Sequence, residues 1–170
     1  PAQVIQSNSG VNIAPVLNTT PGVYMQNGTL STNRITIRGI GSRTLFGTSK
    51  IRAYYQDIPL TNGSGETTVE DIELAGLSRM EVLKGPSSSL YGAALGGTIQ
   101  MISNKGLFDT YALQSAFTFG SFGLQKFQVS ANLGDKTNSA SLIYSNTQSK
   151  GYRENNELNR QNFSVSSNHY

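Results

Sequence analysis

The sequence predicts a small α+β domain followed by antiparallel β-strands of the kind that cross a membrane as a barrel. Three observations support this. Two strand-like runs between Arg79 and Ser103 flank a tight, glycine-rich reversal. The 18 glycines, with many Ser, Asn, Thr and Gln residues, suit turns and β-structure. From Leu107 onward, apolar and polar residues alternate with a strict period of two, which indicates strands with one apolar face.

The chain opens with a short predicted helix. Ser9 can cap it through its hydroxyl, although Pro15 lies inside the segment. Pro21-Gly22 ends the helix, and residues 23–25 form a short strand. The apolar residues of the helix are Val11, Ile13, Val16 and Leu17.

Two further strands are expected before the reversal. Asn33 to Arg38 is the first, with Ile35 and Ile37 facing inward. Lys50 to Tyr55 is the second, and a turn leads from it into Ile58-Pro59.

The segments between these strands are polar loops and one expected helix. Gly41 to Ser49 and Thr61 to Thr68 are glycine-containing loops. Val69 to Gly76 is predicted to be a short helix, because Glu70 and Asp71 suit its positive end.

The reversal itself has a turn chemistry that can be worked out from its residues. Met80 and Val82 lie on one face of the first run. Pro86 can open a helical turn, and Gly92 can close it in a left-handed conformation. Gly96-Gly97 then permits close backbone approach before the second run.

Four consecutive strands are predicted after Leu107. They could form a water-soluble meander with one face on a core, or the wall of a barrel. The connection Gly120–Gly123 is short, Gly134–Thr137 is a tight turn, and Ser149–Asn159 is long and polar. A barrel has short periplasmic turns and longer external loops, and these three connections can be placed in turn outside, in the periplasm and outside, which favours a barrel. The apolar faces carry, strand by strand, Tyr111, Leu113, Phe117 and Phe119; Phe127, Val129, Ala131 and Leu133; Ala140, Leu142 and Tyr144; and Phe163 and Val165.

Composition argues against several function classes. Without cysteine, the chain has neither a disulfide framework nor a thiolate metal site. His169 is the single histidine, so we expect no metal site and no catalytic triad. The Gly39–Gly41 pair lacks the third glycine of a dinucleotide-binding loop, and no cofactor is expected. The net charge is +3, but Lys and Arg are scattered, which argues against nucleic-acid binding. An enzyme is not expected.

The order V-L-K-G-P-x-x-x-L-Y-G…G-G-x-I, from Val82 to Ile99, resembles the plug-domain signature of TonB-dependent outer-membrane receptors. The Pro21-Gly22-Val23 joint and the Ile37-Arg38-Gly39 end of a strand are similar to the same family. The resemblance implies an outer-membrane location in a Gram-negative bacterium.

The resemblance also implies a domain organisation. Residues 1–106 would form the α+β plug domain, and residues 107–170 the first strands, about four, of a plugged barrel of about 22 strands. Such an open sheet leaves backbone groups unsatisfied in lipid. We therefore expect the chain to be a fragment of that barrel protein.

The function implied is import of a scarce nutrient, a siderophore-, haem- or cobalamin-like chelate, with plug rearrangement driven by TonB. Family members pair with TonB by strand addition. The implied partners are TonB with its inner-membrane motor proteins, outer-membrane lipid, the small-molecule chelate and other outer-membrane proteins. Two alternatives use the same fold: a partner in an outer-membrane complex, and an oligosaccharide importer. The glycan-importing branch tends to read D-A-S-A-x-x-Y-G…A-N-G-V, which is absent here.

On this resemblance, the loops 41–49 and 61–68 face outward, with residues 87–94 near them. Each ligand-facing candidate could equally pack against the barrel wall or its external loops. These candidates are Arg43, Leu45, Phe46, Asn62 and Tyr91.

Arg38 and Lys84 match positions where the family places basic residues that pair with barrel carboxylates. The family usually has Arg at the second position, and Lys offers a point charge instead of a fork. Glu81 is expected to pair with Lys84 or Arg38 inside the plug, so that the three residues form a latch between plug and barrel.

Overall fold

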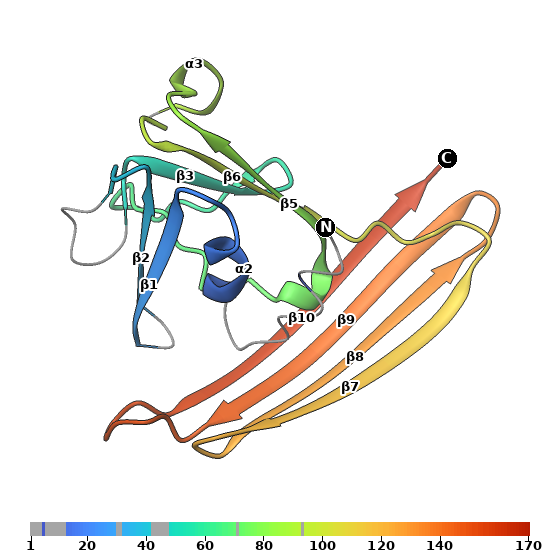
Figure 1. The fold of residues 1–170 in the computed structure, drawn as a ribbon. Coiled ribbons are helices and arrows are strands. Elements are labelled where there is room, and N and C mark those ends of the chain that lie inside the picture. Colours follow the sequence, from blue (N-terminus) through green and yellow to red (C-terminus); the bar gives the residue numbers. More distant parts are fainter. Residues whose placement is uncertain (1–4, 6–12, 30–31, 42–47, 71, 93) are drawn as a thin grey trace. The chain divides into compact units, whose positions relative to one another are not determined.

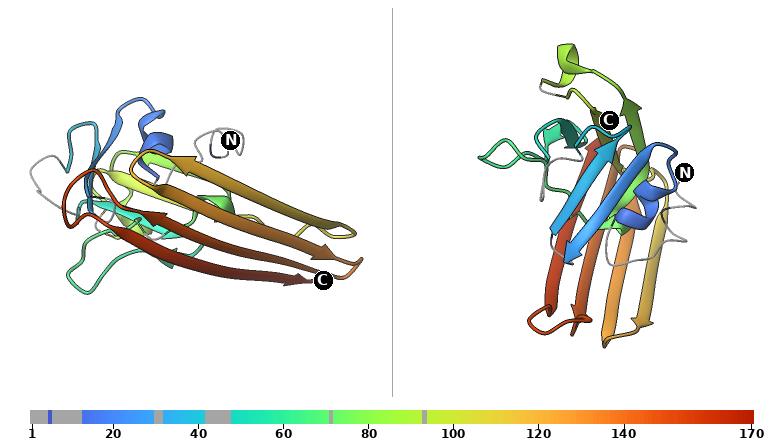
Figure 2. Two further views of the ribbon diagram at one scale, coloured as in Figure 1. Left: turned by 90° about the horizontal axis from the view of Figure 1, so that it is seen from below. Right: turned by 60° about the vertical axis from the view of Figure 1, so that its left-hand side comes forward.

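The computed structural model describes residues 5, 13–29, 32–41, 48–70, 72–92 and 94–170. The chain divides into two compact units, Pro1–Ser103 and Asn104–Tyr170. Figures 1 and 2 show short helices and strands in the first unit and long, adjacent strands in the second. The domain boundary expected at residues 106 and 107 stays a prediction. Among the described residues, no helix is long and apolar enough to span a membrane.

The first unit contains a hairpin and a mixed sheet. Its elements are α2 (Ala14–Asn18), β1 (Val23–Thr29), β2 (Thr32–Ile37), β3 (Ile51–Tyr55), β4 (Ile58–Pro59), η1 (Leu74–Gly76), β5 (Leu77–Lys84), α3 (Ser88–Tyr91) and β6 (Gly97–Ser103). Strands β1 and β2 form the antiparallel hairpin, and the mixed sheet has the order β4-β3-β6-β5. Strands β3 and β6 run parallel, while the other two pairs of that sheet are antiparallel.

Helix α2 shows how the chain accommodates a proline. Pro15 lies in its first turn, where the missing N–H costs no hydrogen bond. The expected cap, Ser9, lies outside the described residues. The side chain of Asn18 then fixes the helix to β1, since its Nδ2 donates to the Met25 carbonyl at 3.1 Å and its Oδ1 accepts from the Met25 N–H at 2.7 Å.

The helix expected over residues 69–76 is wrong except at its end, where the 3₁₀ turn η1 forms. Val69 is fully buried in the core, and Glu73 is extended, with φ −78° and ψ 118°. The Glu73 carboxylate accepts from the Ala75 N–H at 3.3 Å and so caps the short turn. The burial of Val69 outweighs the weak helix preference of so short a segment.

One hydrophobic core joins the hairpin and the mixed sheet of the first unit. The inward faces of β2, β3 and β6 meet in it with α2. The sequence predicted these inward faces correctly for β2, because apolar residues there alternate with polar ones. The fully buried side chains at its centre are Ile35, Ile37, Ile51, Ala53, Ile99 and Met101.

The reversal between β5 and β6 follows its expected turn chemistry. Pro86 precedes α3, and Gly92 ends it with φ +68°, in the left-handed region. The Gly85 N–H donates to the Gly96 carbonyl at 3.2 Å, and the Ser87 N–H donates to the Ala94 carbonyl at 3.1 Å.

The second unit is an antiparallel sheet with the order β10-β9-β8-β7. Its strands are β7 (Tyr111–Gly120), β8 (Leu124–Gly134), β9 (Asn138–Ser149) and β10 (Leu158–His169). The four predicted strands, their order along the chain and their three connections are all present.

One face of this sheet exposes apolar side chains. Tyr111, Leu113, Phe117 and Phe119 of β7 are between 66% and 76% exposed, and Phe163 of β10 is 72% exposed. Strand register pairs Tyr111, Leu113 and Phe117 with apolar residues of β8, and it pairs Phe163 with Tyr144 of β9. Ile143 of β9 lies buried on the opposite face, with Ser141 and Ser145.

The segment leading into β7 lies against the opposite face of β8 and β9. A side chain at Gly134 would collide with the carbonyl oxygen of Leu107. A Cβ at Gly106 would come within 2.9 Å of the Ala140 backbone. These two glycines allow the backbones to approach.

Candidate functional site

The loop between β4 and η1 is organised by Asn62. Its Oδ1 accepts from the Ser64 N–H at 3.0 Å and from the Glu66 N–H at 2.9 Å, and its own N–H donates to the Glu66 carbonyl at 2.9 Å. The bridge Thr61–Thr67 closes the loop. Asn62 is therefore both exposed and structurally required, because an asparagine that bonds its own backbone sets a turn.

Arg52 of β3 holds this loop through hydrogen bonds from its guanidinium group. Its Nη1 donates to the Gly65 carbonyl at 2.9 Å and to Thr61 Oγ1 at 3.2 Å. Arg52 lies on β3 between Ile51 and Ala53, which are fully buried, so its side chain points to the opposite face of the sheet. The loop is held to the sheet by a charged, half-buried donor.

Buried threonines complete the anchorage. Thr67 Oγ1 donates to the Ile51 carbonyl at 2.5 Å, and the Thr67 N–H donates to the Thr48 carbonyl at 2.9 Å. Both threonines are 1% exposed. The end of the loop 61–68 is therefore fixed to β3 and to Thr48, three residues before that strand begins.

Tyr91 is held by Tyr54, which lies on the same face of β3 as Arg52. Its ring packs on that of Tyr54, with centroids 5.3 Å apart, and Tyr54 Oη donates to the Tyr91 carbonyl at 3.3 Å. The nearby Ser87 Oγ lies 2.8 Å from Thr98 Oγ1. Two of the five ligand-facing candidates, Asn62 and Tyr91, thus depend on neighbouring side chains of β3.

The other three candidates, Arg43, Leu45 and Phe46, lie outside the described residues. Arg52 and Tyr54 were not among the candidates. The sequence could have identified Arg52 and Tyr54, because they alternate with the apolar residues Ile51 and Ala53. Such alternation predicts that β3 has a second face, which carries Arg52 and Tyr54.

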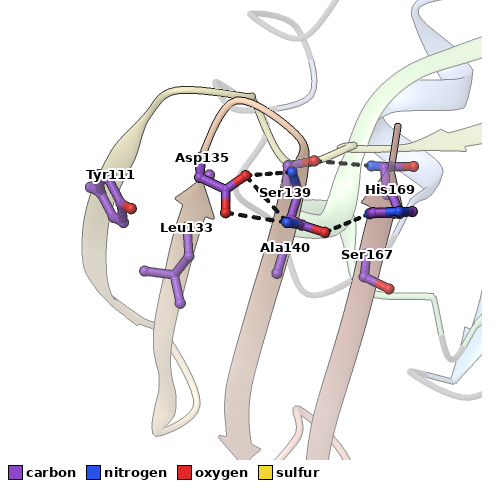
Figure 3. A pocket seen from close by; sticks show the side chains of 10 residues that line it. Tyr111, Leu133, Asp135, Ser139, Ala140, Ser167 and His169 are labelled. Atoms are coloured by element: carbon purple, nitrogen blue, oxygen red, sulfur yellow. Dashed lines mark hydrogen bonds between the residues drawn. The ribbon is translucent and has the colours of Figure 1, made fainter.

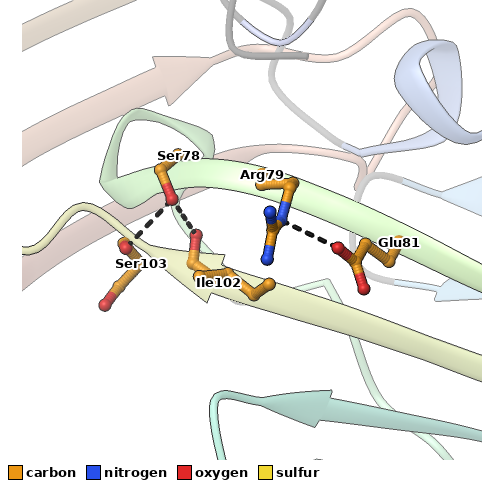
Figure 4. Close-up of polar contacts among 5 residues, drawn as sticks. All are labelled: Ser78, Arg79, Glu81, Ile102 and Ser103. Carbon is orange, nitrogen blue, oxygen red and sulfur yellow. Dashed lines mark hydrogen bonds and ion pairs between the residues drawn. The ribbon is translucent and has the colours of Figure 1, made fainter.

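The expected latch residues are arranged differently from the expectation. Glu81 forms an ion pair with Arg79, with 2.8 Å between Arg79 Nε and Glu81 Oε1, and both side chains are about half exposed (Figure 4). Within the described residues, Arg38 and Lys84 form no ion pair. Ser78 Oγ, beside the pair, donates to the Ile102 and Ser103 carbonyls at 3.1 Å.

Strand periodicity explains why Glu81 does not meet Lys84. Residues 81 and 84 of β5 point to opposite faces, whereas residues 79 and 81 share one. Lys84 instead lines a cavity of about 270 Å³ with Met80 and Val82. Arg38 follows β2 with φ +51°, and its N–H donates to the Gly22 carbonyl at 2.8 Å.

The described residues hold no group of three or more His, Cys, Asp or Glu side chains that could bind a metal ion. Asp135 has a clearly displaced pKa. Hydrogen bonds from the Thr137 and Asn138 backbone N–H groups, then from the Asn138 side chain, lower it to about 2. Asp135 lies in the turn between β8 and β9, and these contacts fix that turn.

Comparison with known proteins gives consistent results. Residues 1–98 match the family model described as TonB-dependent Receptor Plug Domain. An iron-regulated outer membrane virulence protein of Vibrio cholerae is 34% identical over 97 residues, which is 55% of this chain and 15% of that protein. The ferrioxamine receptor of Yersinia enterocolitica is 30% identical over 99 residues, which is 55% of this chain and 13% of that protein.

Among solved structures, the copper transporter OprC superposes with a TM-score of 0.77 at 18% identity. The superposition covers 98% of this chain and 27% of that one. Because the identity is low, this similarity concerns the fold. The chain spans about 15% of the length of the curated relatives that it matches.

Proposed function

The chain belongs to the family of TonB-dependent receptor plug domains, and on that premise we propose that it forms the plug and adjoining barrel strands of a receptor that imports a small metal chelate. The family consists of outer-membrane receptors, not enzymes. The chain is accordingly an outer-membrane protein of a Gram-negative bacterium. The family match to residues 1–98 is the observation that carries the proposal.

A siderophore-like iron chelate is the substrate class best supported. Two of the curated relatives, described above, are named for iron regulation and for ferrioxamine. The motif Gly85-Pro86…Gly96-Gly97 also reads as the chelate branch of the family instead of the oligosaccharide branch. Haem- and cobalamin-like chelates belong to the same proposal.

In the proposed mechanism, the chelate contacts the loop that contains Asn62, together with Tyr91. Both groups are anchored on β3, through Arg52 and Tyr54. A ligand that orders this loop would therefore act directly on a central strand of the mixed sheet. TonB would then supply force, and local opening of the less stable parts of the plug would clear a path.

The test is growth of the source bacterium on single chelates. A strain without the gene, a complemented strain and a complemented strain without TonB are compared on ferric siderophore, haem and cobalamin. We expect the complemented strain alone to grow on one chelate. Growth that is independent of TonB indicates a passive pore. Loss of growth on an oligosaccharide only indicates a glycan importer, and no difference on any nutrient indicates a role in an outer-membrane complex. Each of these three results contradicts the proposal.

A further inference from the structure

A hollow of about 370 Å³ lies on the exposed apolar face of the second unit, at the end where β8 turns into β9 (Figure 3). One row of cross-strand neighbours forms it: Tyr111, Leu133, Ala140 and Ser167, from β7, β8, β9 and β10 in turn. The first two side chains are large and the last two are small. The step in size across the row creates the hollow.

The rim on the turn side of the hollow is polar and ordered. Asn138 Nδ2 donates to the Asp135 carboxylate at 3.2 Å, and Asn138 Oδ1 lies 2.7 Å from His169 Nδ1 (Figure 3). The carboxylate can only accept, so it fixes which end of the Asn138 amide faces it. Asn138 Oδ1 can then only accept from His169 Nδ1–H, which leaves Nε2 of a neutral imidazole as an acceptor.

The other side of the hollow is apolar. The next row of the same face carries Leu113, Ala131, Leu142 and Val165. From Tyr111 to Phe119, β7 rises about 27 Å, which is comparable with the apolar band of about 25 Å on outer-membrane barrels. The hollow therefore lies where an apolar surface meets a polar rim, so its shape and chemistry fit an amphiphile.

We propose that this hollow binds a phospholipid with a primary ammonium head group, the chemistry of phosphatidylethanolamine. The ammonium would donate to His169 Nε2 and Ser167 Oγ, the Asp135 carboxylate on the other side of Asn138 would favour its positive charge, and an acyl chain would lie along Leu142 and Val165. The proposal deepens the proposed function, since it rests on the outer-membrane location of the chain.

The charges around the hollow favour an ammonium over an anionic head group. The hollow is lined by the carboxylate of Asp135. Among residues 94–170, all of which the structure describes, no lysine or arginine lines it. Lys136, exposed in the adjoining turn, is the cation closest in sequence, and it suits the phosphate that follows the ammonium in such a lipid. A choline head group has the same charge but no N–H to donate, so it should bind less well.

The test uses the full-length receptor, purified in detergent and depleted of lipid. An equimolar mixture of phosphatidylethanolamine, phosphatidylcholine and phosphatidylglycerol is added, and native mass spectrometry measures the lipid retained. We expect phosphatidylethanolamine to be retained at least fivefold over each of the other two. Equal retention of the three lipids, or preference for phosphatidylglycerol, overturns the proposal.

Matched variants locate the site. Ala140→Leu fills the hollow and should abolish the preference, whereas Ser115→Leu, on the same face two rows away, should keep it. His169→Phe keeps an aromatic ring but removes the acceptor, and should reduce the preference while some lipid still binds. Retained preference in Ala140→Leu contradicts the proposal.

Two controls separate possible failures. Heat-dependent migration on gels shows that each barrel variant is folded, and only folded variants are compared. Chelate uptake by Ala140→Leu should remain at the wild-type level, because the hollow is formed by β7 to β10, whereas the loop 61–68 belongs to the first unit. Uptake with no lipid preference overturns only the lipid proposal, whereas lipid preference with no uptake of any chelate overturns only the transport proposal.

Discussion

Arg52 shows how one side chain can connect a surface loop to the sheet beneath it. It makes two hydrogen bonds from one nitrogen, to Thr61 Oγ1 and to the Gly65 carbonyl. Both acceptors belong to the loop that Asn62 organises. Since hydrogen bonds from charged donors are stronger than neutral ones, Arg52 is a strong link between this loop and β3, in addition to the buried Thr67.

Replacing Arg52 with alanine should loosen the loop 61–68. Two partly buried acceptors lose a charged donor, so we expect the loop to be destabilised by about 1–3 kcal/mol and chelate affinity to fall about tenfold. Hydrogen exchange of the Ser64 and Glu66 amides in the full receptor, with titration of the chelate, measures both effects. Arg34→Ala, which removes a half-buried arginine of β2 that bonds Gln26 Oε1 at 2.6 Å and lies outside this loop, is the control. Unchanged exchange in Arg52→Ala would show that Asn62 and Thr67 hold the loop without Arg52.

Asp135 provides a pH-dependent contact in the turn between β8 and β9. Its pKa is lowered from 3.8 to about 2 by backbone donors, first Thr137 and then Asn138. A carboxyl group with a depressed folded pKa contributes stability that is fully present above its unfolded pKa and is lost as the pH falls through the folded value. The turn should therefore stay ordered down to about pH 4 and loosen towards pH 2.

The carboxyl carbon chemical shift of Asp135, followed by NMR in the detergent-solubilised receptor, measures this titration. We expect a midpoint near pH 2. In Asn138→Ala the midpoint should rise, because the Asn138 side chain no longer donates to the carboxylate. A midpoint at the ordinary value in the unaltered protein would mean that these hydrogen bonds are not kept in solution.

At the scale of elements, the close pairing of β5 with β6 depends on glycine at the start of β6. Gly97 has φ +138°, and a Cβ there would collide with the Leu83 carbonyl oxygen. The substitution Gly97→Ala should therefore destabilise the β5–β6 pair by about 2–3 kcal/mol.

Amide exchange of β5 and β6 in the full receptor measures this loss. Gly63→Ala is the matched control, since nothing lies within 4 Å of a Cβ at that exposed position. Equal protection of both variants would contradict the close approach of the two backbones at Gly97.

Strand β3 is the element on which the candidate site is built. Its inward residues Ile51 and Ala53 fill the core, and its outward residues Arg52 and Tyr54 hold the loop 61–68 and α3. One strand thus links core packing to two segments proposed to meet the ligand. This explains how a stable core can position loops that have few buried contacts of their own.

For the whole receptor, the ion pair of Arg79 and Glu81 should matter little to the plug itself. Both side chains are about half exposed, and such pairs contribute about 0–1 kcal/mol. A latch role for Glu81 and Arg38 must then come from partners on the barrel wall. We expect the double variant Arg38→Gln/Glu81→Gln to leak small solutes and admit antibiotics.

The comparison with Arg79→Gln makes this prediction specific. That variant breaks the ion pair but leaves Arg38 and Glu81 in place, so its permeability should equal that of the unaltered receptor. Antibiotic susceptibility and solute leakage in cells expressing each variant are the measurements. Equal leakage of the two variants, or none in either, would exclude the latch.

The family and most of the strands could be predicted from the sequence. The motif from Val82 to Ile99 identifies the family. Period-two alternation locates the strands of the second unit, because the apolar or polar character of each residue indicates the face of the sheet on which it lies. The turn at Gly92 was also predictable from local sequence, because a backbone with positive φ favours glycine, which has no Cβ. The ligand candidates stay predictions: Asn62 and Tyr91 lie on segments anchored to β3, and Arg43, Leu45 and Phe46 lie outside the described residues.

Tertiary structure alone decided which residues meet. Glu81 pairs with Arg79, and Val69 leaves its expected helix to enter the core, because packing with distant segments outweighs weak local preference. Arg52 reaches the loop 61–68, and the hollow beside Ala140 forms, only once four strands take a particular register. A single strand reveals which face each of its residues takes, but contacts between strands depend on register, which is set by the packing of the whole sheet.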